Sequence, residues 1–331
     1  MKFMVYNVIE SEIPFVKKWS EDNAIEVDFT DKLLDINSVE LAKNYDGIST
    51  LQLQPMENEL FEKMHKLNIP VLTIRNVGTD NIDLVAAKQN DILVTNVPTY
   101  SPESIAEFSV MMSLYLTRKA GYMQDLLHQK HQFHNEDHFI GKLISDMTVG
   151  IIGTGHIGRA AIKLFKGLGA KIIAYDKFAV DTDDGDIEYD NDIDELLRQA
   201  DIVDLHVPGS PDNYHLINRE RLDIMKNSAI LINTARGSLV DTQALIYALE
   251  NSIIAGAGLD TFEDEPGDIL DTKSNQTLND PNIIALAKMP NTIVTPHVAF
   301  NTQESIENMV NTSLDNLKTV MLTGTSENSV N

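Results

Sequence analysis

Residues 148–176, TVGIIGTGHIGRAAIKLFKGLGAKIIAYD, decide how the second half of this chain folds. An apolar run leads into three glycines, Gly153, Gly155 and Gly158, and a helical pattern begins at once. Apolar residues then recur at the spacing of a helix with one face on a core, at Ile157, Ala160, Ala161, Leu164, Phe165 and Leu168. A second apolar run ends in Asp176, which lies 18 residues beyond Gly158. The stretch therefore predicts a strand, a glycine-rich turn, an amphipathic helix and a parallel strand.

Each part of this stretch suits the binding of a dinucleotide. One glycine allows the tight turn, one lets the backbone approach a pyrophosphate, and one lets helix and strand pack closely. The helix N-terminus attracts the phosphate charge. A carboxylate at Asp176 can accept hydrogen bonds from a ribose diol and would repel a 2′-phosphate. The complete order of elements, which a plain glycine-rich turn does not need, therefore predicts NAD rather than NADP as cofactor.

Short apolar runs alternate with helical patterns along the whole chain, which predicts parallel sheets covered by helices. In the first hundred residues the expected strands are KFMVYN, IEVDFT, DGIST, PVLTIRN and ILVTNV. From residue 147 they are TVGII, KIIAYD, DIVDLHV, SAILINT, IIAGAGLD and TIVTP. One long helix is expected at about 102–129, and the tail after residue 300 is helical. We expect two doubly wound α/β domains, one made of residues 1–100 with 300–331 and the other of residues 101–299.

Composition excludes several classes of protein. The 331 residues include no cysteine, which rules out disulfides, thiol nucleophiles and cysteine-ligated metals. A net charge of −24 would be repelled by nucleic acid and by anionic membranes, so neither is an expected partner. No apolar run reaches the length of a membrane span, and MKFMVYNVIE at the start reads as a strand rather than a signal peptide. We therefore expect a cytoplasmic protein.

Polar side chains follow the later strands of the second series. Ligands of open α/β sheets bind outside the carboxyl ends of the strands. After the glycine loop and Asp176, the strands deliver His206-Val207-Pro208, Thr234-Ala235-Arg236-Gly237, Asp260 and His297. These residues are therefore expected at one edge of a single sheet, where His206 either contacts a cofactor or caps the end of its strand.

Three residues near this edge can carry chemistry. Arg236 offers a planar, permanently charged fork that suits a carboxylate. His297 can transfer a proton near neutral pH, and Glu265, a few residues beyond the fifth strand, can stabilise the protonated imidazole as an opposite charge. Together with a hydride carrier, these groups predict reduction of a 2-keto acid. The alternative for His297 is a polar residue that merely ends a strand.

The segments GTGHIG, NTARGSLVDT, LDTFEDEP and TPHVAF, with RNVGTDNID and NVPTYSPESIAE upstream, resemble the D-2-hydroxyacid dehydrogenase family. The resemblance covers essentially the whole chain and is strongest to the branch of bacterial D-lactate and D-2-hydroxyisocaproate dehydrogenases. It implies a flavodoxin-like substrate domain, a Rossmann NAD domain and a homodimer. It also implies that Arg236 binds the substrate carboxylate, that His297 protonates the carbonyl and that Glu265 is the partner of His297.

The resemblance assigns further site residues. Those implied at the substrate are Leu51, Val77, Gly78, Tyr100 and Phe300. Those implied at the cofactor, besides the glycine loop, are His156, Ile157, Asp176, His206, Val207, Pro208, Asn213, Thr234, Ala235 and Asp260. Leu51 stands where lactate-preferring relatives commonly carry tyrosine, which favours bulky apolar keto acids with pyruvate still accepted. The alternatives are a D-lactate dehydrogenase proper and a non-catalytic NAD-sensing interaction protein.

Two stretches suggest a metal site at first sight, but neither has the required pattern. His128, His131, His134 and His138 crowd together without the H-E-x-x-H spacing of a zinc site. In the acidic stretch 181–194, a calcium-binding loop with Gly185 at its sixth place would begin at Val180 and end at Asn191, which fails. We predict no bound metal.

Overall fold

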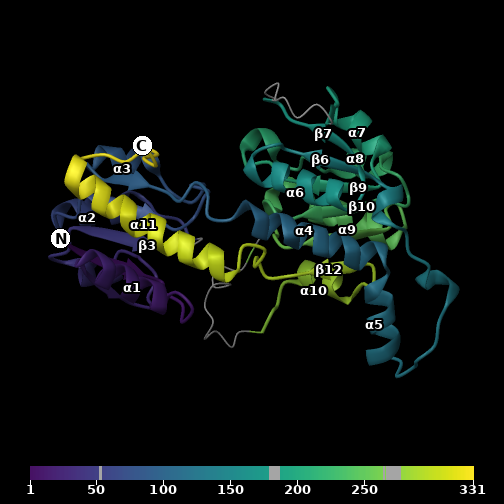
Figure 1. Cartoon of the computed structure of the whole chain (residues 1–331), viewed down its shortest axis with the longest axis horizontal. Coiled ribbons are helices and arrows are strands. Elements are labelled where there is room, and N and C mark those ends of the chain that lie inside the picture. The colour runs from purple at the N-terminus through teal and green to yellow at the C-terminus, as the bar shows by residue number, and fades with distance from the viewer. Residues whose placement is uncertain (52–53, 179–186, 264, 266–276) are drawn as a thin grey trace. The chain divides into compact units, whose positions relative to one another are not determined.

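The computed structural model describes residues 1–331 except 52–53, 179–186, 264 and 266–276. The described residues form two compact units (Figure 1). Unit 1 contains Met1–Ser101 and Asn301–Asn331, and unit 2 contains the described residues between Pro102 and Phe300. In the described part of the chain, no helix combines the length and apolarity needed to cross a membrane.

Unit 1 is built on a five-stranded sheet whose strands all pair in parallel, in the order β2-β1-β3-β4-β5. The strands are β1 (Lys2–Tyr6), β2 (Glu26–Phe29), β3 (Gly47–Thr50), β4 (Val71–Ile74) and β5 (Leu93–Thr95). This is the flavodoxin-like order, in which the direction of winding reverses between β1 and β3. Every residue of β3 and β4 is buried, as expected for central strands covered on both faces.

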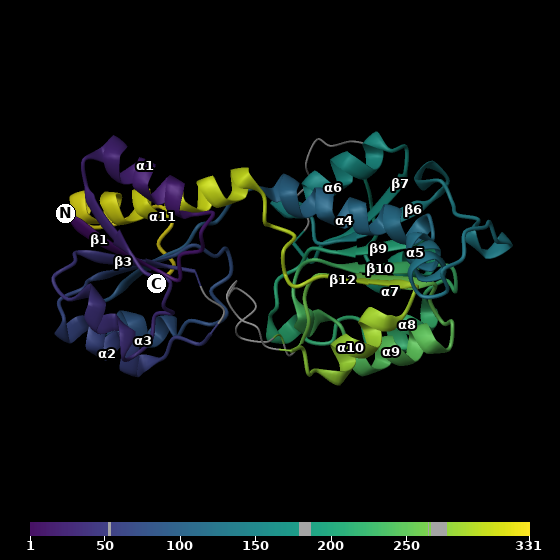
Figure 2. The same cartoon turned by 90° about the horizontal axis from the view of Figure 1, so that it is seen from below.

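Helices cover both faces of the sheet in unit 1 (Figure 2). They are α1 (Ile13–Asn23), η1 (Ser38–Ala42), α2 (Asn58–Lys66), α3 (Leu84–Gln89) and α11 (Gln303–Thr323). Helices α1 and α11 share one apolar core with the sheet, and α2 and α3 share the other. The Trp19 indole donates to Asp315 at 2.9 Å, so the C-terminal helix is held to the first one.

Unit 2 contains a seven-stranded parallel sheet in the order β12-β11-β10-β9-β6-β7-β8. The strands are β6 (Thr148–Ile152), β7 (Lys171–Tyr175), β8 (Glu188–Tyr189), β9 (Ile202–Leu205), β10 (Ile230–Asn233), β11 (Gly256–Leu259) and β12 (Thr292–Val294). The chain forms β6 first and adds β7 and β8 on one side of it. It then returns to add β9, β10, β11 and β12 on the other side of β6. This is the Rossmann order extended by one strand, and its reversal point lies between β6 and β9.

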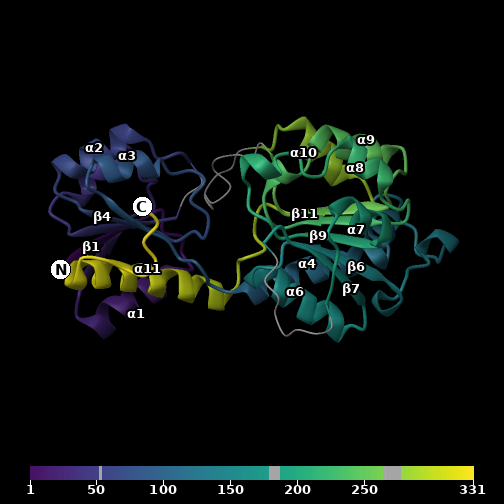
Figure 3. The same ribbon diagram turned by 90° about the horizontal axis from the view of Figure 1, so that it is seen from above.

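The helices of unit 2 also form two layers (Figure 3). They are α4 (Pro102–Thr117), α5 (Ala120–His128), η2 (Asp137–Phe139), η3 (Ile144–Asp146), α6 (His156–Gly167), α7 (Ile193–Gln199), η4 (Pro211–Asn213), α8 (Arg219–Ile224), η5 (Gly237–Leu239), α9 (Thr242–Glu250) and α10 (Pro281–Lys288). Helices α4 and α6 pack on one face of the sheet, and α7 to α10 pack on the other. The prediction of two doubly wound parallel sheets is confirmed.

Three local predictions need correction. The expected helix at 102–129 is two helices, because Lys119 takes a left-handed φ of 58° between α4 and α5. The short strand β8 was not predicted. On α6 the buried residues include Ile162, while Leu168 lies just past the helix end and is 41% exposed.

Candidate active site

The glycine loop of unit 2 connects β6 to α6, and two of its glycines are sterically required. Gly153 has a φ of 99°, and a Cβ there would lie 2.5 Å from the carbonyl oxygen of His206. A Cβ on Gly158 would lie 2.0 Å from the carbonyl oxygen of Gly153. A Cβ on Gly155, in contrast, would meet nothing within 4 Å. The loop is therefore closely packed on its protein side and open at the start of α6, as a pyrophosphate site requires.

Asp176 follows β7 directly and lies beside the glycine loop. Its Oδ2 accepts hydrogen bonds from the Thr154 backbone at 2.7 Å and the Thr154 hydroxyl at 3.0 Å, and its Oδ1 accepts from the Phe178 backbone at 2.8 Å. Partial burial raises the pKa of this carboxyl, but the hydrogen bonds outweigh burial and leave the pKa below its ordinary value. An ionised carboxylate therefore lies beside the glycine loop, at the end of β7.

Asp176→Ala is expected to lower the ratio of kcat/KM with NADH to kcat/KM with NADPH by about 10- to 100-fold. The reason is that a hydrogen bond to a charged group contributes about 1.5–3 kcal/mol. Because the lowered pKa keeps the carboxylate ionised, the contribution of Asp176 to NADH binding should be constant between about pH 5 and 8. Steady-state kinetics with both cofactors measures this ratio. Asp223→Ala, which removes a surface carboxylate paired with Arg219, is the charge control. An unchanged ratio in Asp176→Ala would remove this residue from cofactor selection.

Strands β10, β11 and β12 are neighbours in register, so their carboxyl ends lie side by side at one edge of the sheet. Arg236 is the third residue after β10. Its Nη1 donates to the carbonyl of Ala235 at 2.9 Å, and its own carbonyl accepts from Asn233 at 2.8 Å. Its Cγ lies 3.0 Å from the position of a Cβ on Gly209, so the aliphatic part of the side chain packs against backbone. The guanidinium is thus held at the edge that receives the other predicted residues.

His297 and Glu265 are in direct contact in unit 2. Nδ1 of His297 lies 2.8 Å from Oε2 of Glu265, and Oε1 of Glu265 accepts from the Phe262 backbone at 2.8 Å. The two side chains are 22% and 17% exposed. With Nδ1 facing the carboxylate, Nε2 is the ring nitrogen able to exchange a proton with a substrate. His297 also adopts a φ of 54°, a left-handed conformation that non-glycine residues rarely adopt and that persists where surrounding structure enforces it.

Asp260 holds the turn that carries His297. The Asp260 side chain is completely buried, and its carboxylate accepts from the Thr295 hydroxyl at 2.5 Å and from the backbone of Val298 and Ala299 at 3.0 and 2.8 Å. Its carbonyl accepts from the His297 backbone at 2.8 Å. Sequence reasoning expected Asp260 at the cofactor and missed this support, because every partner lies more than 30 residues along the chain.

The other residues predicted at the cofactor gather at the same edge of the sheet. His156 and Ile157 open α6, and a side chain on Gly153 would meet Val207. Asn213 donates to the carbonyl of Pro208 at 2.9 Å, which closes the loop after β9. Thr234 and Ala235 directly follow β10.

Several buried polar atoms at this edge lack a hydrogen bond. Within the described residues these include Oγ1 of Thr234 and Oγ1 of Thr261, at the ends of β10 and β11. Buried polar groups in native proteins are normally bonded to protein, water or ligand. The two threonine hydroxyls at the carboxyl edge therefore fit a polar ligand bound there.

The residues predicted at the substrate are divided between the units. Phe300 belongs to unit 2 and its ring packs edge-on against His297, with centroids 6.5 Å apart. The others belong to unit 1, where Leu51 follows β3 and is 4% exposed. Val77 and Gly78 follow β4, and the carbonyl of Val77 accepts from Asn96 at 2.7 Å. The carbonyl of Tyr100 accepts from Asn308 at 2.6 Å. Gln52 and Leu53, next to Leu51, lie outside the described residues.

In the histidine-rich stretch considered for metal binding, two histidines contact a glutamate. His134 and His138 both contact Glu136, at 2.9 and 3.0 Å. Among the residues that the structure describes, no three histidine or acidic side chains gather in a way that could hold a metal ion. The first part of the calcium-like stretch, residues 181–186, lies outside the described part of the chain.

One buried acid near the cofactor edge escaped sequence analysis. Asp204 lies within β9 and is completely buried, with its Oδ2 2.5 Å from the Ser109 hydroxyl and 3.0 Å from Nε2 of His206. The signal was present, since an acidic residue in the middle of the apolar run DIVDLHV needs a buried partner. The contact with α4 could not be read from the sequence.

Comparison with known proteins identifies close relatives. Residues 110–299 match the family model described as "D-isomer specific 2-hydroxyacid dehydrogenase, NAD binding domain". The "D-2-hydroxyacid dehydrogenase (NAD+)" of Lacticaseibacillus paracasei is 44% identical over 330 residues, covering 100% of this chain and 98% of the relative. The "D-lactate/D-glycerate dehydrogenase" of Pediococcus acidilactici is 41% identical over 331 residues, covering 100% of this chain and 99% of the relative.

A solved structure of a D-2-hydroxyisocaproate dehydrogenase superposes on this chain with a TM-score of 0.92 at 44% identity. The match covers 100% of this chain and 99% of that structure. The similarity therefore extends over both units and is not confined to the glycine loop.

Proposed function

Because this chain belongs to the D-isomer specific 2-hydroxyacid dehydrogenase family, and is therefore an NAD-dependent oxidoreductase, we propose that it reduces bulky apolar 2-keto acids to D-2-hydroxy acids. The observation that carries the proposal is the 2.8 Å contact between His297 and Glu265 at the carboxyl edge of the Rossmann sheet. A proton-transferring group with a fixed acidic partner is what carbonyl reduction needs beside a hydride carrier. The family assignment sets aside the non-catalytic alternative.

We propose that His297 transfers the proton. In reduction, the protonated ring donates from Nε2 to the keto oxygen as negative charge develops there, and in oxidation the neutral ring accepts the proton of the hydroxyl. Glu265 holds Nδ1, which fixes the orientation of the ring and stabilises its positive charge. When bound, NADH would supply the hydride for reduction of the keto acid, and NAD+ would accept it in oxidation of the hydroxy acid.

The carboxylate of the substrate is assigned to Arg236. A guanidinium is planar and positively charged and can hold a carboxylate through two parallel hydrogen bonds. In unit 1 we propose Val77 and Gly78, through their backbone, as further carboxylate-binding groups, with Tyr100 beside them. In unit 2, Phe300 is proposed as a wall of the site next to His297.

The dinucleotide is assigned to the carboxyl edge of unit 2. Gly153, Gly155 and Gly158 would accommodate the pyrophosphate at the start of α6, and Asp176 would bind the adenosine ribose. The remaining contacts are proposed for His156, Ile157, His206, Val207, Pro208, Asn213, Thr234, Ala235 and Asp260.

Two substrate preferences remain to be separated: bulky apolar keto acids, or pyruvate as in a D-lactate dehydrogenase proper. Leu51 supports the first, because leucine leaves more room than tyrosine for a branched or aromatic substrate side chain. The D-2-hydroxyisocaproate dehydrogenase structure is 44% identical to this chain, and the D-lactate/D-glycerate dehydrogenase is 41% identical. The choice therefore depends on pocket shape rather than on overall similarity.

Leu51→Tyr is expected to shift selectivity towards pyruvate. Methylene-scale changes in a hydrophobic pocket alter discrimination by about 10- to 200-fold, and we expect an effect in that range. The measurement is kcat/KM with NADH for keto acids from pyruvate through 2-ketoisocaproate to phenylpyruvate. Leu41→Tyr, at a leucine of unit 1 that is 43% exposed, is the matched control. Wild-type protein that prefers pyruvate over the bulky acids would instead favour the lactate assignment.

We also propose a cytoplasmic homodimer. The absence of cysteine fits a reducing compartment. Apolar side chains stand exposed on α4, α5 and the segment that follows, at Met111, Leu114, Met123, Leu127, Phe133, Ile140 and Leu143. Exposed apolar groups of this kind fit burial against a second copy of the chain. A particle with the mass of one chain in sedimentation experiments would contradict the dimer.

A further inference from the structure

A buried ion pair in unit 1 has no part in the chemistry proposed above. The Arg75 side chain is completely buried and that of Glu12 is 2% exposed. Nε of Arg75 donates to Oε1 of Glu12 at 2.8 Å, and Nη2 donates to Oε2 at 3.1 Å. Removing two charges from water often opposes folding as much as their attraction favours it. Stability alone is therefore a weak reason for this pair, and its other contacts indicate what it does.

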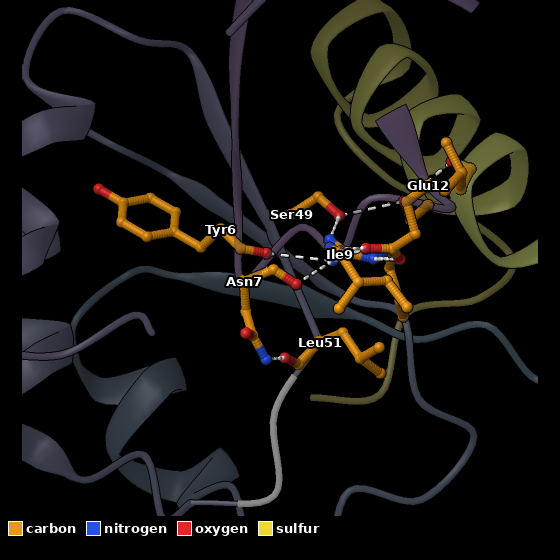
Figure 4. Close-up of polar contacts among 9 residues, drawn as sticks. Tyr6, Asn7, Ile9, Glu12, Ser49 and Leu51 are labelled. Atoms are coloured by element: carbon orange, nitrogen blue, oxygen red, sulfur yellow. Dashed lines mark hydrogen bonds and ion pairs between the residues drawn. The ribbon is translucent and has the colours of Figure 1, made fainter. Parts of the chain in front are cut away.

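The same guanidinium holds three separate parts of unit 1. Nη2 also donates to the carbonyls of Tyr6 and Asn7, at 3.1 and 3.2 Å, where β1 ends. Nη1 donates to the hydroxyl of Ser49 in β3 at 3.1 Å. Glu12 in turn accepts from the Ile9 backbone at 3.1 Å, just before α1 (Figure 4). One buried cation thus joins the end of β1, the middle of β3 and the start of α1.

These contacts lie where the strand order of unit 1 reverses. Ligands of open α/β sheets bind outside the carboxyl ends of the strands at such a reversal, which here lies between β1 and β3. The Asn7 side chain spans this point and donates to the carbonyl of Leu51 (Figure 4). The backbone nitrogen of Arg75 donates to the carbonyl of Thr50 at 2.8 Å. The backbone of Leu51 is therefore fixed from β1 on one side and from β4 on the other.

The segment after β4 is anchored by the same residue. Arg75 lies two positions before Val77, and the backbone between them is tied to the residues after β5. The carbonyl of Asn76 accepts from the Val97 backbone at 3.1 Å, and that of Val77 accepts from the Asn96 side chain at 2.7 Å. The backbone from Arg75 to Val77 is thus bonded at both ends.

The burial of Arg75 decides between two possible roles. A guanidinium that binds a substrate carboxylate must be accessible to the substrate. The Arg75 guanidinium is completely buried, and its Nε and Nη2 already bind the carboxylate of Glu12. Its charge is neutralised within the protein, so it cannot act as an anion site. What it can do is hold the backbone on which the substrate-contacting residues stand.

We propose that Arg75 and Glu12 are positioning residues for the substrate. Through Tyr6, Asn7 and Ser49 on one side and the strand that leads to Val77 on the other, they fix the carboxyl edge of unit 1. The inference rests on the proposed function in which Leu51, Val77 and Gly78 contact the keto acid. Loss of the pair should raise KM for the keto acid and lower the kcat/KM ratio of 2-ketoisocaproate to pyruvate. The binding of NADH, which is assigned to unit 2, should not change.

The decisive variant replaces both members of the pair, Arg75→Met with Glu12→Leu, so that no unpaired charge is left buried. We expect KM for 2-ketoisocaproate to rise at least tenfold, with the dissociation constant of NADH, measured by fluorescence, within twofold of wild type. Thr73→Val is the matched control, since it removes a buried hydrogen bond to Thr95 in the same sheet. It should lower the unfolding temperature and leave KM within twofold.

Asn7→Gly keeps the test decisive if the double variant does not fold. Asn7 has a φ of 51°, which glycine accepts readily, so this variant removes little besides the contact with Leu51. We expect a three- to tenfold rise in KM and a smaller kcat/KM ratio of 2-ketoisocaproate to pyruvate. Wild-type KM and ratio in Asn7→Gly, or in a folded double variant, would overturn the inference. Wild-type enzyme that reduces no keto acid would contradict the proposed function, and the inference with it.

Discussion

His297→Gln is expected to lower kcat for keto-acid reduction by about 10²- to 10⁴-fold, the usual contribution of a positioned acid or base. Glutamine places its side-chain amide near the position of Nε2, whereas Nδ1 is the ring atom that now lies 2.8 Å from Glu265. It cannot deliver a proton to the developing alkoxide. Ground-state binding should change little, so the loss should appear in kcat and the dissociation constant of NADH should stay near that of wild type.

The matched control for this variant is His134→Gln. His134 also contacts a glutamate, Glu136 at 2.9 Å, but it lies on the surface of unit 2 and has no proposed role. Its kcat should equal that of wild type. If His297→Gln retained more than about a tenth of wild-type kcat, proton transfer would have to be assigned to another group.

Arg236→Lys is expected to raise KM for the keto acid by about 10- to 100-fold with a smaller change in kcat. An ammonium retains the charge but cannot form the two parallel hydrogen bonds, and a hydrogen bond to a charged group contributes about 1.5–3 kcal/mol. Each 1.4 kcal/mol corresponds to about a tenfold change in binding. The aliphatic part of the Arg236 side chain packs against Gly209. Because the backbone is held there, it cannot shift to bring a lysine ammonium to the position of the guanidinium.

Initial-rate kinetics over a range of keto-acid concentration measures this effect. Arg198→Lys on α7, at an arginine whose 2.7 Å ion pair with Glu195 is exposed, should leave KM unchanged. A wild-type KM in Arg236→Lys would show that the substrate carboxylate is held elsewhere.

Local sequence patterns were sufficient for most of the fold. The glycine loop and Asp176 were found because a strand, a turn and a helix each have their own spacing, and all of them lie within 30 residues. Strand β8 was missed because its two residues are too few to show any alternation. The break at Lys119 was missed because apolar residues recur at helical spacing on both sides of it.

The placement of the candidate site at strand ends could be anticipated, but the contacts that support it could not. Arg236, Glu265 and His297 stand near strand ends, and a parallel sheet places strand ends at one edge without further information. Asp260 bonds to residues 35 to 39 positions later, and Arg75 to a residue 63 positions earlier. No spacing rule connects such pairs, because their proximity is a result of the completed fold. A charged residue within an apolar run, such as Asp204, indicates that the residue has a buried partner. The sequence does not identify that partner.

The configuration of the reduction product tests the central claim most directly. Purified protein with NADH and 2-ketoisocaproate should yield the D-2-hydroxy acid, separated from its mirror image by chiral chromatography, and His297→Gln should yield almost none in the same time. Formation of the L-isomer, or no hydroxy acid from the wild-type protein, would contradict the account.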